Sequence, residues 1–220
     1  MPGILYIVAT PIGNLEDITL RAISTLKAVD LIAAEDTRHT KILLDRYGIS
    51  KPTTSYFAHS KVQKVEYIIS LLQEGKSVAV VSDAGTPGIS DPGYKIIRTA
   101  IDSGITVVPI PGPSGLVTAL TVSGKPTDSF TFEGFLSNKS GKRRNQLKKL
   151  KEEERTVVLY ESPHRITKLL DDILEVYGDV EIVLARELTK KFEEVRREKV
   201  SASIAHFKVT KILGEFIVIL

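Results

Sequence analysis

The first half of the chain alternates apolar runs with amphipathic segments, and this alternation restricts the possible folds more than any other feature. Each short apolar run has the length and composition of a buried strand, and each longer segment carries apolar residues at helical spacing. Strands that alternate with helices across short connections form a parallel sheet with helices on both faces. We expect strands at 5–9, 31–34, 53–57, 78–81 and 106–110, and helices at 20–28, 38–47, 60–73 and 94–102, the first of them capped by Asp17 or Thr19.

The second half has a different rhythm, which predicts a mixed sheet. A polar, highly charged insert at 137–154 separates two of its expected strands. We therefore expect two α/β domains, residues 1–113 with a mostly parallel sheet and residues 114–220 with a mixed sheet. The expected elements of the second domain are strands at 130–133, 156–161, 181–185, 192–199 and 214–220, and helices at 116–122, 166–177 and 204–207.

A loop rich in glycine and proline follows the fourth expected strand. Residues 82–93 read Ser-Asp-Ala-Gly-Thr-Pro-Gly-Ile-Ser-Asp-Pro-Gly. Glycine permits close approach of the backbone, proline stiffens the loop, and the Ser, Thr and Asp side chains supply polar groups. Because ligands of open α/β sheets bind outside the carboxyl ends of the strands, we interpret the segment as a ligand loop rather than a plain connection. The loops at 10–15 and 109–115 should lie at the same edge.

Two common nucleotide-binding loops are absent from the sequence. Gly13 precedes Glu35 and Asp36 by about 22 residues, near the spacing of a ribose-binding acid in dinucleotide-binding folds. The first loop lacks G-x-G-x-x-G, however, and no G-x-x-x-x-G-K-[ST] occurs, so a dinucleotide or triphosphate is disfavoured. The carboxylates and backbone groups of the loops better suit a ligand with hydroxyls and no net negative charge, such as S-adenosylmethionine with its sulfonium, ribose and amino-acid parts.

The composition excludes several other classes of protein and site. The 220 residues include no cysteine, which excludes disulfides and thiolate chemistry and favours a reducing, cytoplasmic compartment. The four histidines form no close pair, so we expect no zinc site. No apolar run has the length of a membrane span, and the N-terminus does not resemble a signal peptide. A net charge of +3 does not by itself indicate a nucleic-acid binder.

Six motifs spread over the chain carry a family resemblance. In the first half they are Val-Ala-Thr-Pro-Ile-Gly-Asn-Leu at 8–15, Ala-Glu-Asp-Thr-Arg at 34–38, the loop at 81–93, and Pro-Gly-Pro-Ser at 111–114. In the second half they are Tyr-Glu-Ser-Pro-His-Arg at 160–165 and Ala-Arg-Glu-Leu-Thr-Lys at 185–190. Together they resemble the tetrapyrrole (class III) methylase superfamily and, within it, the small-subunit ribosomal RNA methyltransferase I family. The match runs from residue 5 to 220, and we expect this chain to lack the small C-terminal domain of most members.

The resemblance implies a fold, a reaction and a set of binding residues. The implied molecule is a homodimer of two-domain α/β chains with S-adenosylmethionine in the cleft between the domains. The implied reaction is 2′-O-methylation of a cytidine in 16S ribosomal RNA, at the decoding site of the small subunit. Asp83 would lie on the ribose or sulfonium side, and Ile89 would pack on the cofactor. The full set of implied cofactor residues is Pro11, Asp83, Ala84, Gly85, Ile89, Ser114, Gly115 and Leu188, of which Leu188 is equally well interpreted as a core residue.

Methyl transfer requires positioning, and a ribose 2′-hydroxyl benefits from a general base. Glu161, Glu35, Asp36 and Lys190 lie at expected strand ends and are the candidates, with Glu161 first. The alternative for Glu161 is an ion pair with Arg165 or Arg186. If Glu161 is the base, Glu161→Gln abolishes turnover and spares cofactor binding.

The charged insert packs seven cations into a helix-prone stretch at 138–151, and only Leu147 and Leu150 are expected to anchor it. Like charges crowded on a helix repel, and a phosphate backbone relieves that repulsion. A solvated helix balanced by nearby glutamates is the alternative. Given the resemblance, we interpret the insert as a mobile, RNA-binding arm whose binding depends steeply on salt. The candidate contacts are Lys142, Arg143, Arg144, Lys148 and Lys149.

Two other functions remain open from the sequence. The same fold could act on a small, tetrapyrrole-like molecule or on a protein side chain, although such an acceptor has no need of the basic insert. The chain could also be a non-catalytic RNA-binding assembly factor that retains the cofactor pocket. Cofactor binding without methyl transfer would indicate the latter.

Overall fold

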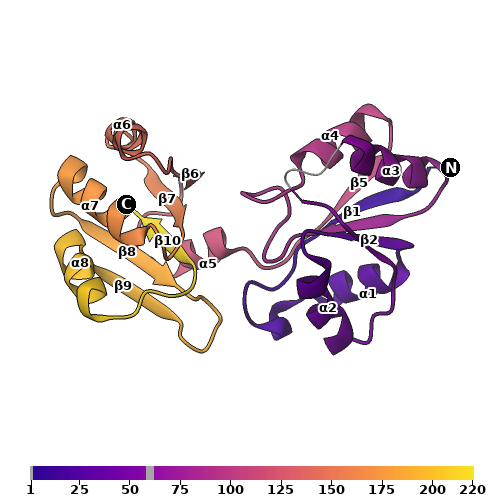
Figure 1. Cartoon of the computed structure of the whole chain (residues 1–220), viewed down its shortest axis with the longest axis horizontal. Helices are drawn as coiled ribbons and strands as arrows, with labels where there is room; N and C mark the ends of the chain where they lie inside the picture. The colour runs from indigo at the N-terminus through magenta and orange to yellow at the C-terminus, as the bar shows by residue number, and fades with distance from the viewer. Residues whose placement is uncertain (1, 58–61) are drawn as a thin grey trace. The chain divides into compact units, whose positions relative to one another are not determined.

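The computed structural model describes residues 2–57 and 62–220, and it divides into two compact units, Met1–Ser114 and Gly115–Leu220. Figure 1 shows the N-terminal unit in indigo to magenta and the C-terminal unit in magenta to yellow. Each unit contains a five-stranded sheet of its own, with the strand orders β3-β2-β4-β1-β5 and β6-β7-β10-β8-β9.

The sheet of the N-terminal unit is entirely parallel, as the strand–helix alternation predicts. Its helices cover both faces, with α3 and α4 on one side and α1 and α2 on the other (Figure 1). The elements are β1 (Ile4–Val8), η1 (Leu15–Asp17), α1 (Leu20–Ala28), β2 (Leu31–Ala34), α2 (Thr37–Arg46), β3 (Thr53–Ser55), α3 (Val62–Gln73), β4 (Val78–Val81), α4 (Tyr94–Asp102) and β5 (Thr106–Ile110).

The buried strands divide their side chains between the two helical layers. In β4, Val78 and Val80 pack with α3 and α4, whereas Ala79 and Val81 pack with α1 and α2. All four residues are buried because a strand with helices on both faces has no solvent side. The side chain of Thr19 caps α1 by accepting a hydrogen bond from the Ala22 amide at 3.0 Å, which confirms one of the two expected caps.

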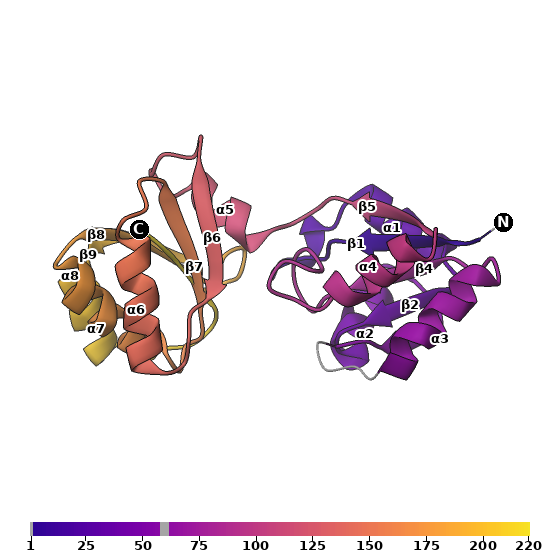
Figure 2. The same ribbon diagram turned by 90° about the horizontal axis from the view of Figure 1, so that it is seen from above.

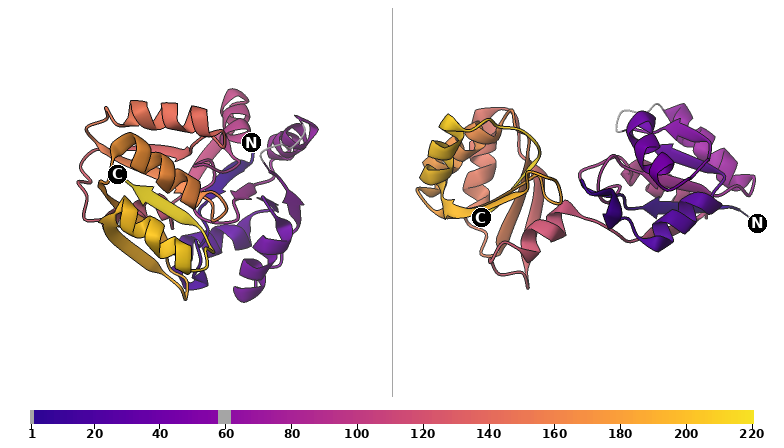
Figure 3. Two further views of the ribbon diagram at one scale, coloured as in Figure 1. Left: turned by 60° about the vertical axis from the view of Figure 1, so that its left-hand side comes forward. Right: turned by 90° about the horizontal axis from the view of Figure 1, so that it is seen from below.

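The sheet of the C-terminal unit is mixed. Strand β6 is parallel to β7, and the other pairs are antiparallel. Helices α6, α7 and α8 lie side by side on one face, and α5 packs on the other face against β10 (Figures 2 and 3). The elements are α5 (Gly115–Thr121), β6 (Phe130–Phe135), α6 (Ser140–Leu150), β7 (Thr156–Glu161), α7 (Ile166–Tyr177), β8 (Glu181–Arg186), β9 (Glu194–Lys199), α8 (Val200–Val209) and β10 (Phe216–Ile219).

Three expectations about individual elements are corrected. Strand β3 ends at Ser55 and not at residue 57 as expected. Of the helix expected at 60–73, residues 60 and 61 lie outside the described residues, and the structure describes α3 from Val62. Helix α8 spans ten residues instead of four, because Val200 and Phe207 anchor its two ends in the core. The charged insert is an ordered helix docked on α7, rather than a mobile arm.

Within the described ranges, no helix combines the length and the apolar composition that crossing a bilayer requires.

Candidate functional site

Three loops meet at the carboxyl edge of the N-terminal sheet, as expected. Thr10 and Gly85 exchange backbone hydrogen bonds of 2.8 and 3.0 Å, which joins the loop after β1 to the loop after β4. The Thr10 hydroxyl also donates to the Ser82 carbonyl at 3.1 Å. The Thr86 hydroxyl donates to the Pro113 carbonyl at 3.3 Å and so ties in the loop after β5. The loops are thus fixed to one another by hydrogen bonds at an edge where open α/β sheets bind ligands.

The loop after β4 requires glycine at several positions. Gly85 and Gly88 have φ angles of +76° and +87°, a region that disfavours side chains. A Cβ on Gly93 would lie 2.8 Å from the Gly88 amide nitrogen and 2.9 Å from its Cα, so these two turns of the loop touch through backbone alone. Ile89, at the tip, is 45% exposed. The loop therefore presents backbone groups and one apolar side chain on a constrained frame.

Two acidic residues at the end of β2 are bound to Asp83 at the end of β4. The Asp36 amide donates to Oδ1 of Asp83 at 3.0 Å, and the Asp83 amide donates to Oε2 of Glu35 at 3.3 Å. Burial raises the pKa of Glu35, with a further rise from the charge of Asp83 and an opposing contribution from the Asp83 amide. Hydrogen bonds from Arg38 hold the pKa of Asp36 far below its usual range. Of these two candidate bases, Glu35 has the stronger affinity for a proton.

The raised pKa of Glu35 predicts a pH-dependent effect on stability. The folded protein binds this proton more tightly than the unfolded chain does, so the contribution of Glu35 to the free energy of unfolding falls as the pH rises from 4.5 through the raised pKa. Glu35→Gln removes this loss and keeps an oxygen that accepts from the Asp83 amide. We expect the variant to gain stability, relative to the unmodified protein, as the pH rises from 4.5 to about 7. Urea unfolding at both pH values measures the difference, and a difference that does not change with pH would contradict this assignment.

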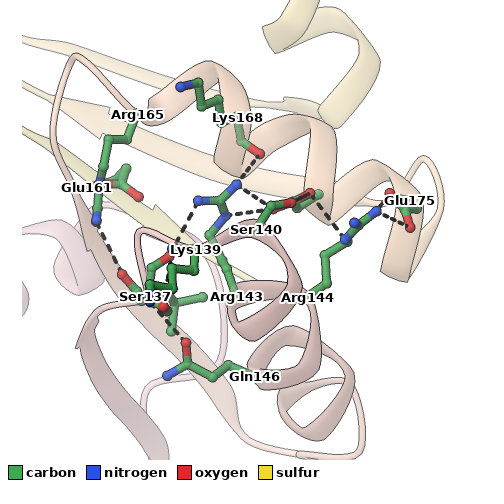
Figure 4. Close-up of polar contacts among 12 residues, drawn as sticks. Ser137, Lys139, Ser140, Arg143, Arg144, Gln146, Glu161, Arg165, Lys168 and Glu175 are labelled. Atoms are coloured by element: carbon green, nitrogen blue, oxygen red, sulfur yellow. Dashed lines mark hydrogen bonds and ion pairs between the residues drawn. The ribbon is translucent and has the colours of Figure 1, made fainter.

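Glu161 is fully buried and ion-paired in the C-terminal unit, which favours the structural alternative over the catalytic one. Its Oε1 accepts from Nε of Arg165 at 2.7 Å and from the Ser162 amide at 2.8 Å. Its side chain shares a strand face with Val157 and Leu159, whose side chains pack under the helices. The carboxylate is 0% exposed, so a substrate hydroxyl has no direct access to it. Figure 4 shows it beside the Arg165 side chain.

Lys190 lies in the turn between β8 and β9. Its ammonium group is 2.9 Å from Oε1 of Glu187 and 3.4 Å from Oε2 of Glu215. Burial alone would lower the pKa of Lys190, but the hydrogen bond to Glu187 and the charges of Glu215 and Glu187 leave it raised. A lysine that holds its proton in this way serves as a hydrogen-bond donor or fixed charge and is a poor general base.

The remaining implied cofactor residues divide between the two units. Pro11, Asp83, Ala84, Gly85, Ile89 and Ser114 belong to the N-terminal unit, and Gly115 and Leu188 to the C-terminal unit. Leu188 is 7% exposed, which agrees with the core interpretation.

Tyr160, which lies in one of the six motifs, contacts the start of α5 beside the implied cofactor residue Gly115, and sequence reasoning missed this contact. Its hydroxyl accepts from the Leu116 amide at 3.0 Å, and a Cβ on Gly115 would lie 3.5 Å from that hydroxyl and 3.3 Å from Ile217. The available signal was strand alternation, which places Tyr160 on the face opposite Glu161.

The charged insert divides into an inner and an outer face. The Arg143 side chain is 3% exposed and lies 2.6 Å from Asp172, so the expectation that Arg143 contacts RNA is corrected. Arg144 is partly exposed, with Nη1 2.5 Å from Oε2 of Glu175. Lys142, Lys148 and Lys149 are exposed. The helical period explains the division, because burying positions 143 and 147 and partly burying 150 turns these lysines toward solvent.

Comparison with known proteins identifies the family. The sequence-family model of the tetrapyrrole (corrin/porphyrin) methylases matches residues 4–203 of this chain. Ribosomal RNA small subunit methyltransferase I of Thermotoga maritima is 52% identical over 99% of this chain and 98% of its own length. The protein of the same name from Escherichia coli O157:H7 is also 52% identical, over 94% of this chain and 72% of its own length.

Solved structures of much lower identity share the fold. Diphthine synthase has a TM-score of 0.77 at 16% identity, and covers 99% of this chain and 90% of its own. Uroporphyrin-III C-methyltransferase from Thermus thermophilus, in complex with S-adenosylhomocysteine, has a TM-score of 0.69 at 17% identity, covering 99% of this chain and 97% of its own. The chain belongs to the tetrapyrrole methylase family and, within it, to the ribosomal RNA small subunit methyltransferase I family.

Proposed function

We propose that the protein transfers a methyl group from S-adenosylmethionine to the ribose 2′-oxygen of a cytidine in 16S ribosomal RNA, at the decoding site of the small subunit. The single observation that carries this proposal is the identity of 52% with small-subunit ribosomal RNA methyltransferases over nearly the whole chain. The arrangement of the loops and of the exposed lysines supports it.

The loops of the N-terminal unit fit the proposed cofactor. Glycine at 85, 88 and 93 lets the loop take a compact path with positive φ angles and a close backbone contact, which leaves backbone amides and carbonyls to contact a ligand. The Asp36 amide uses Oδ1 of Asp83, which leaves Oδ2 to accept from a ribose hydroxyl. Ile89 offers an exposed apolar surface to the adenosine part. Bound S-adenosylmethionine would supply an activated methyl group to the acceptor oxygen.

The reaction needs alignment more than it needs chemical groups from the protein. The bond from the ribose oxygen to the methyl carbon forms as the bond from that carbon to sulfur breaks, and the hydroxyl loses its proton. Glu35 is the candidate acceptor of that proton, because Glu161 is buried and Asp36 and Lys190 have pKa values that disfavour the role.

RNA would bind along the outer face of α6. Lys142, Lys148 and Lys149 are exposed on this face and would neutralise phosphates of the RNA backbone. An RNA backbone presents phosphates at regular spacing over a long distance, whereas a tetrapyrrole carries its carboxylates on one compact ring, so this face favours RNA over the acceptors of the distant structural relatives. Arg144, which forms an ion pair with Glu175, is a secondary candidate for contact with the phosphates.

The partners and compartment follow from the same proposal. The substrate is the small ribosomal subunit, the protein acts in the cytoplasm, and it works as a homodimer. Sedimentation equilibrium of the isolated protein tests the dimer independently of activity.

The function is tested by calorimetry with S-adenosylmethionine, followed by tritium transfer to undermethylated small subunits and mapping of the labelled nucleotide. We expect binding of one cofactor per chain and label on a single cytidine ribose. Label on another nucleotide would refute the specificity, and cofactor binding with no transfer would point to a non-catalytic assembly factor.

A further inference from the structure

The turn between β6 and α6 is held by two arginines that donate to consecutive carbonyls. Nη2 of Arg165 lies 3.3 Å from the Leu136 carbonyl oxygen, and Nη1 of Arg143 lies 3.4 Å from that of Ser137. The Ser137 amide donates to Gln146 in α6 at 2.9 Å. Figure 4 shows these contacts converging on the turn from both sides. The start of the basic helix is thus bound by side chains from α6 itself and from the beginning of α7.

Each of the two arginines is neutralised by a buried carboxylate. Glu161 pairs with Arg165 at 2.6 Å, and Asp172 pairs with Arg143 at the same distance. The two carboxylate side chains are 0% and 9% exposed. Buried pairs of this kind are weak evidence for stability, but here each arginine also donates to a carbonyl of the turn and so holds it in place. We refer to Glu161, Arg165, Arg143 and Asp172 as the arginine clamp.

The clamp joins the end of β7 to the helix that carries the exposed lysines. Glu161 is the last residue of β7, Asp172 lies in α7, and Arg143 lies in α6 between Lys142 and the partly exposed Arg144. The Arg143 guanidinium also donates to the Lys168 carbonyl at 3.4 Å, and the Ser140 hydroxyl lies 3.4 Å from Oδ1 of Asp172. A rotation of α6 about its axis would break these bonds, so the clamp sets the direction in which Lys142, Lys148 and Lys149 point.

We infer that Glu161 and Arg143 are positioning residues for RNA binding, and that the exposed cations of α6 contact the phosphates. This inference rests on the proposed function, because it assigns roles to residues of the proposed RNA-binding surface. It reverses two sequence-based expectations, in which Glu161 was the general base and Arg143 a phosphate contact. Both residues act through α6, and neither touches the substrate.

The assignment of Arg143 is tested with a fluorescein-labelled RNA hairpin and the variants Arg143→Met, Asp172→Leu and the double variant. All three variants should bind the hairpin about tenfold more weakly, because each removes bonds that set the direction of α6. The slope of log affinity against log salt should be unchanged in the double variant, whereas the control Lys142→Met should lose about 0.7 to 0.9 from that slope. If Arg143 bound phosphate instead, Asp172→Leu would free its guanidinium and bind at least as well as the unmodified protein, and the double variant would lose one contact from the slope.

Thermal unfolding separates these effects from misfolding, because the double variant retains the core without a buried charge. Hydrogen exchange of the α6 amides gives a readout that needs no RNA. Faster exchange is expected in all three variants, because each lacks bonds that hold α6 in place, and unchanged exchange in all three would overturn the clamp. Failure of the unmodified protein to bind RNA would refute the proposed function. Unchanged RNA affinity in both single variants would refute only the clamp.

Glu161→Gln distinguishes a positioning residue from a base in steady-state kinetics. We expect the KM for small subunits to rise about tenfold with kcat within about twofold, because the misdirected lysines weaken binding before the chemical step. A general base would instead lower kcat by about 100-fold or more and remove the acid limb of its pH profile. A variant that merely folds poorly would lower the apparent kcat and leave KM unchanged, so either of these two results would overturn the assignment of Glu161.

Discussion

Asp83→Asn is expected to weaken S-adenosylmethionine binding about 10- to 100-fold. A hydrogen bond to a charged group is worth about 1.5–3 kcal/mol, and each 1.4 kcal/mol corresponds to about tenfold in affinity. Asparagine keeps the oxygen that accepts from the Asp36 amide, so the bond between the ends of β2 and β4 survives. The loss therefore reports the second oxygen of Asp83 and its charge. Isothermal titration with the cofactor measures it.

Asp102→Asn is the matched control for this experiment. Asp102 is an exposed aspartate in the same unit, at the end of α4 opposite to the loop after β4, where it pairs with Arg98. Its replacement removes the same charge from the unit and should leave cofactor affinity unchanged. Equal affinity of Asp83→Asn and the unmodified protein would show that the cofactor does not use this carboxylate, and would remove the main polar contact of the proposed site.

Replacing Lys142, Lys148 and Lys149 together by Gln is expected to abolish methyl transfer at physiological salt and to flatten the salt dependence of RNA binding. Each phosphate contact contributes about 0.7 to 0.9 to the slope of log affinity against log salt, so the variant should lose about 2 to 3 from that slope. Cofactor affinity should not change, since none of the three lysines is among the implied cofactor residues and all three lie in α6. Fluorescence anisotropy across a salt series gives the slope.

The control for the lysine variant removes the same charge elsewhere. Lys27, Lys76 and Lys208 are exposed and lie outside α6. Their joint replacement by Gln lowers the net charge by the same amount. It should reduce RNA affinity slightly and change the salt slope by no more than about 0.7 to 0.9, the contribution of one contact. A similar loss of slope in both triple variants would mean that net charge alone attracts RNA, with no specific role for α6.

The strands and helices that the sequence predicted best are those whose whole pattern is local. The limits of β4, α4, β7 and α7 agree residue for residue with the expectation. Each begins or ends where an apolar or periodic run meets a glycine, a serine or a charged residue. Helix α8 was predicted too short because its first turn contains serine and alanine, which carry no helical pattern of their own.

The candidate site was predictable to the level of loops and not of side-chain partners. The rule that ligands bind at the carboxyl edge of a parallel sheet brought the three loops together from sequence. The same reasoning did not pair Glu35 with the Asp83 amide, 48 residues away, or place Tyr160 against the beginning of α5. Those contacts depend on strand order and on the packing of α5, which no local pattern encodes.

The charged insert shows most clearly what the sequence determined and what the tertiary structure decided. Its seven cations and its helical propensity are properties of residues 138–151 alone, and they predicted a basic helix. The direction of each side chain depends on Asp172, which lies 29 residues beyond Arg143 and becomes its neighbour only when α6 docks on α7. A buried charge needs a partner, and partners that are distant in sequence are fixed by the fold. The sequence therefore determined that the helix is basic, and the tertiary structure decided which of its cations face solvent.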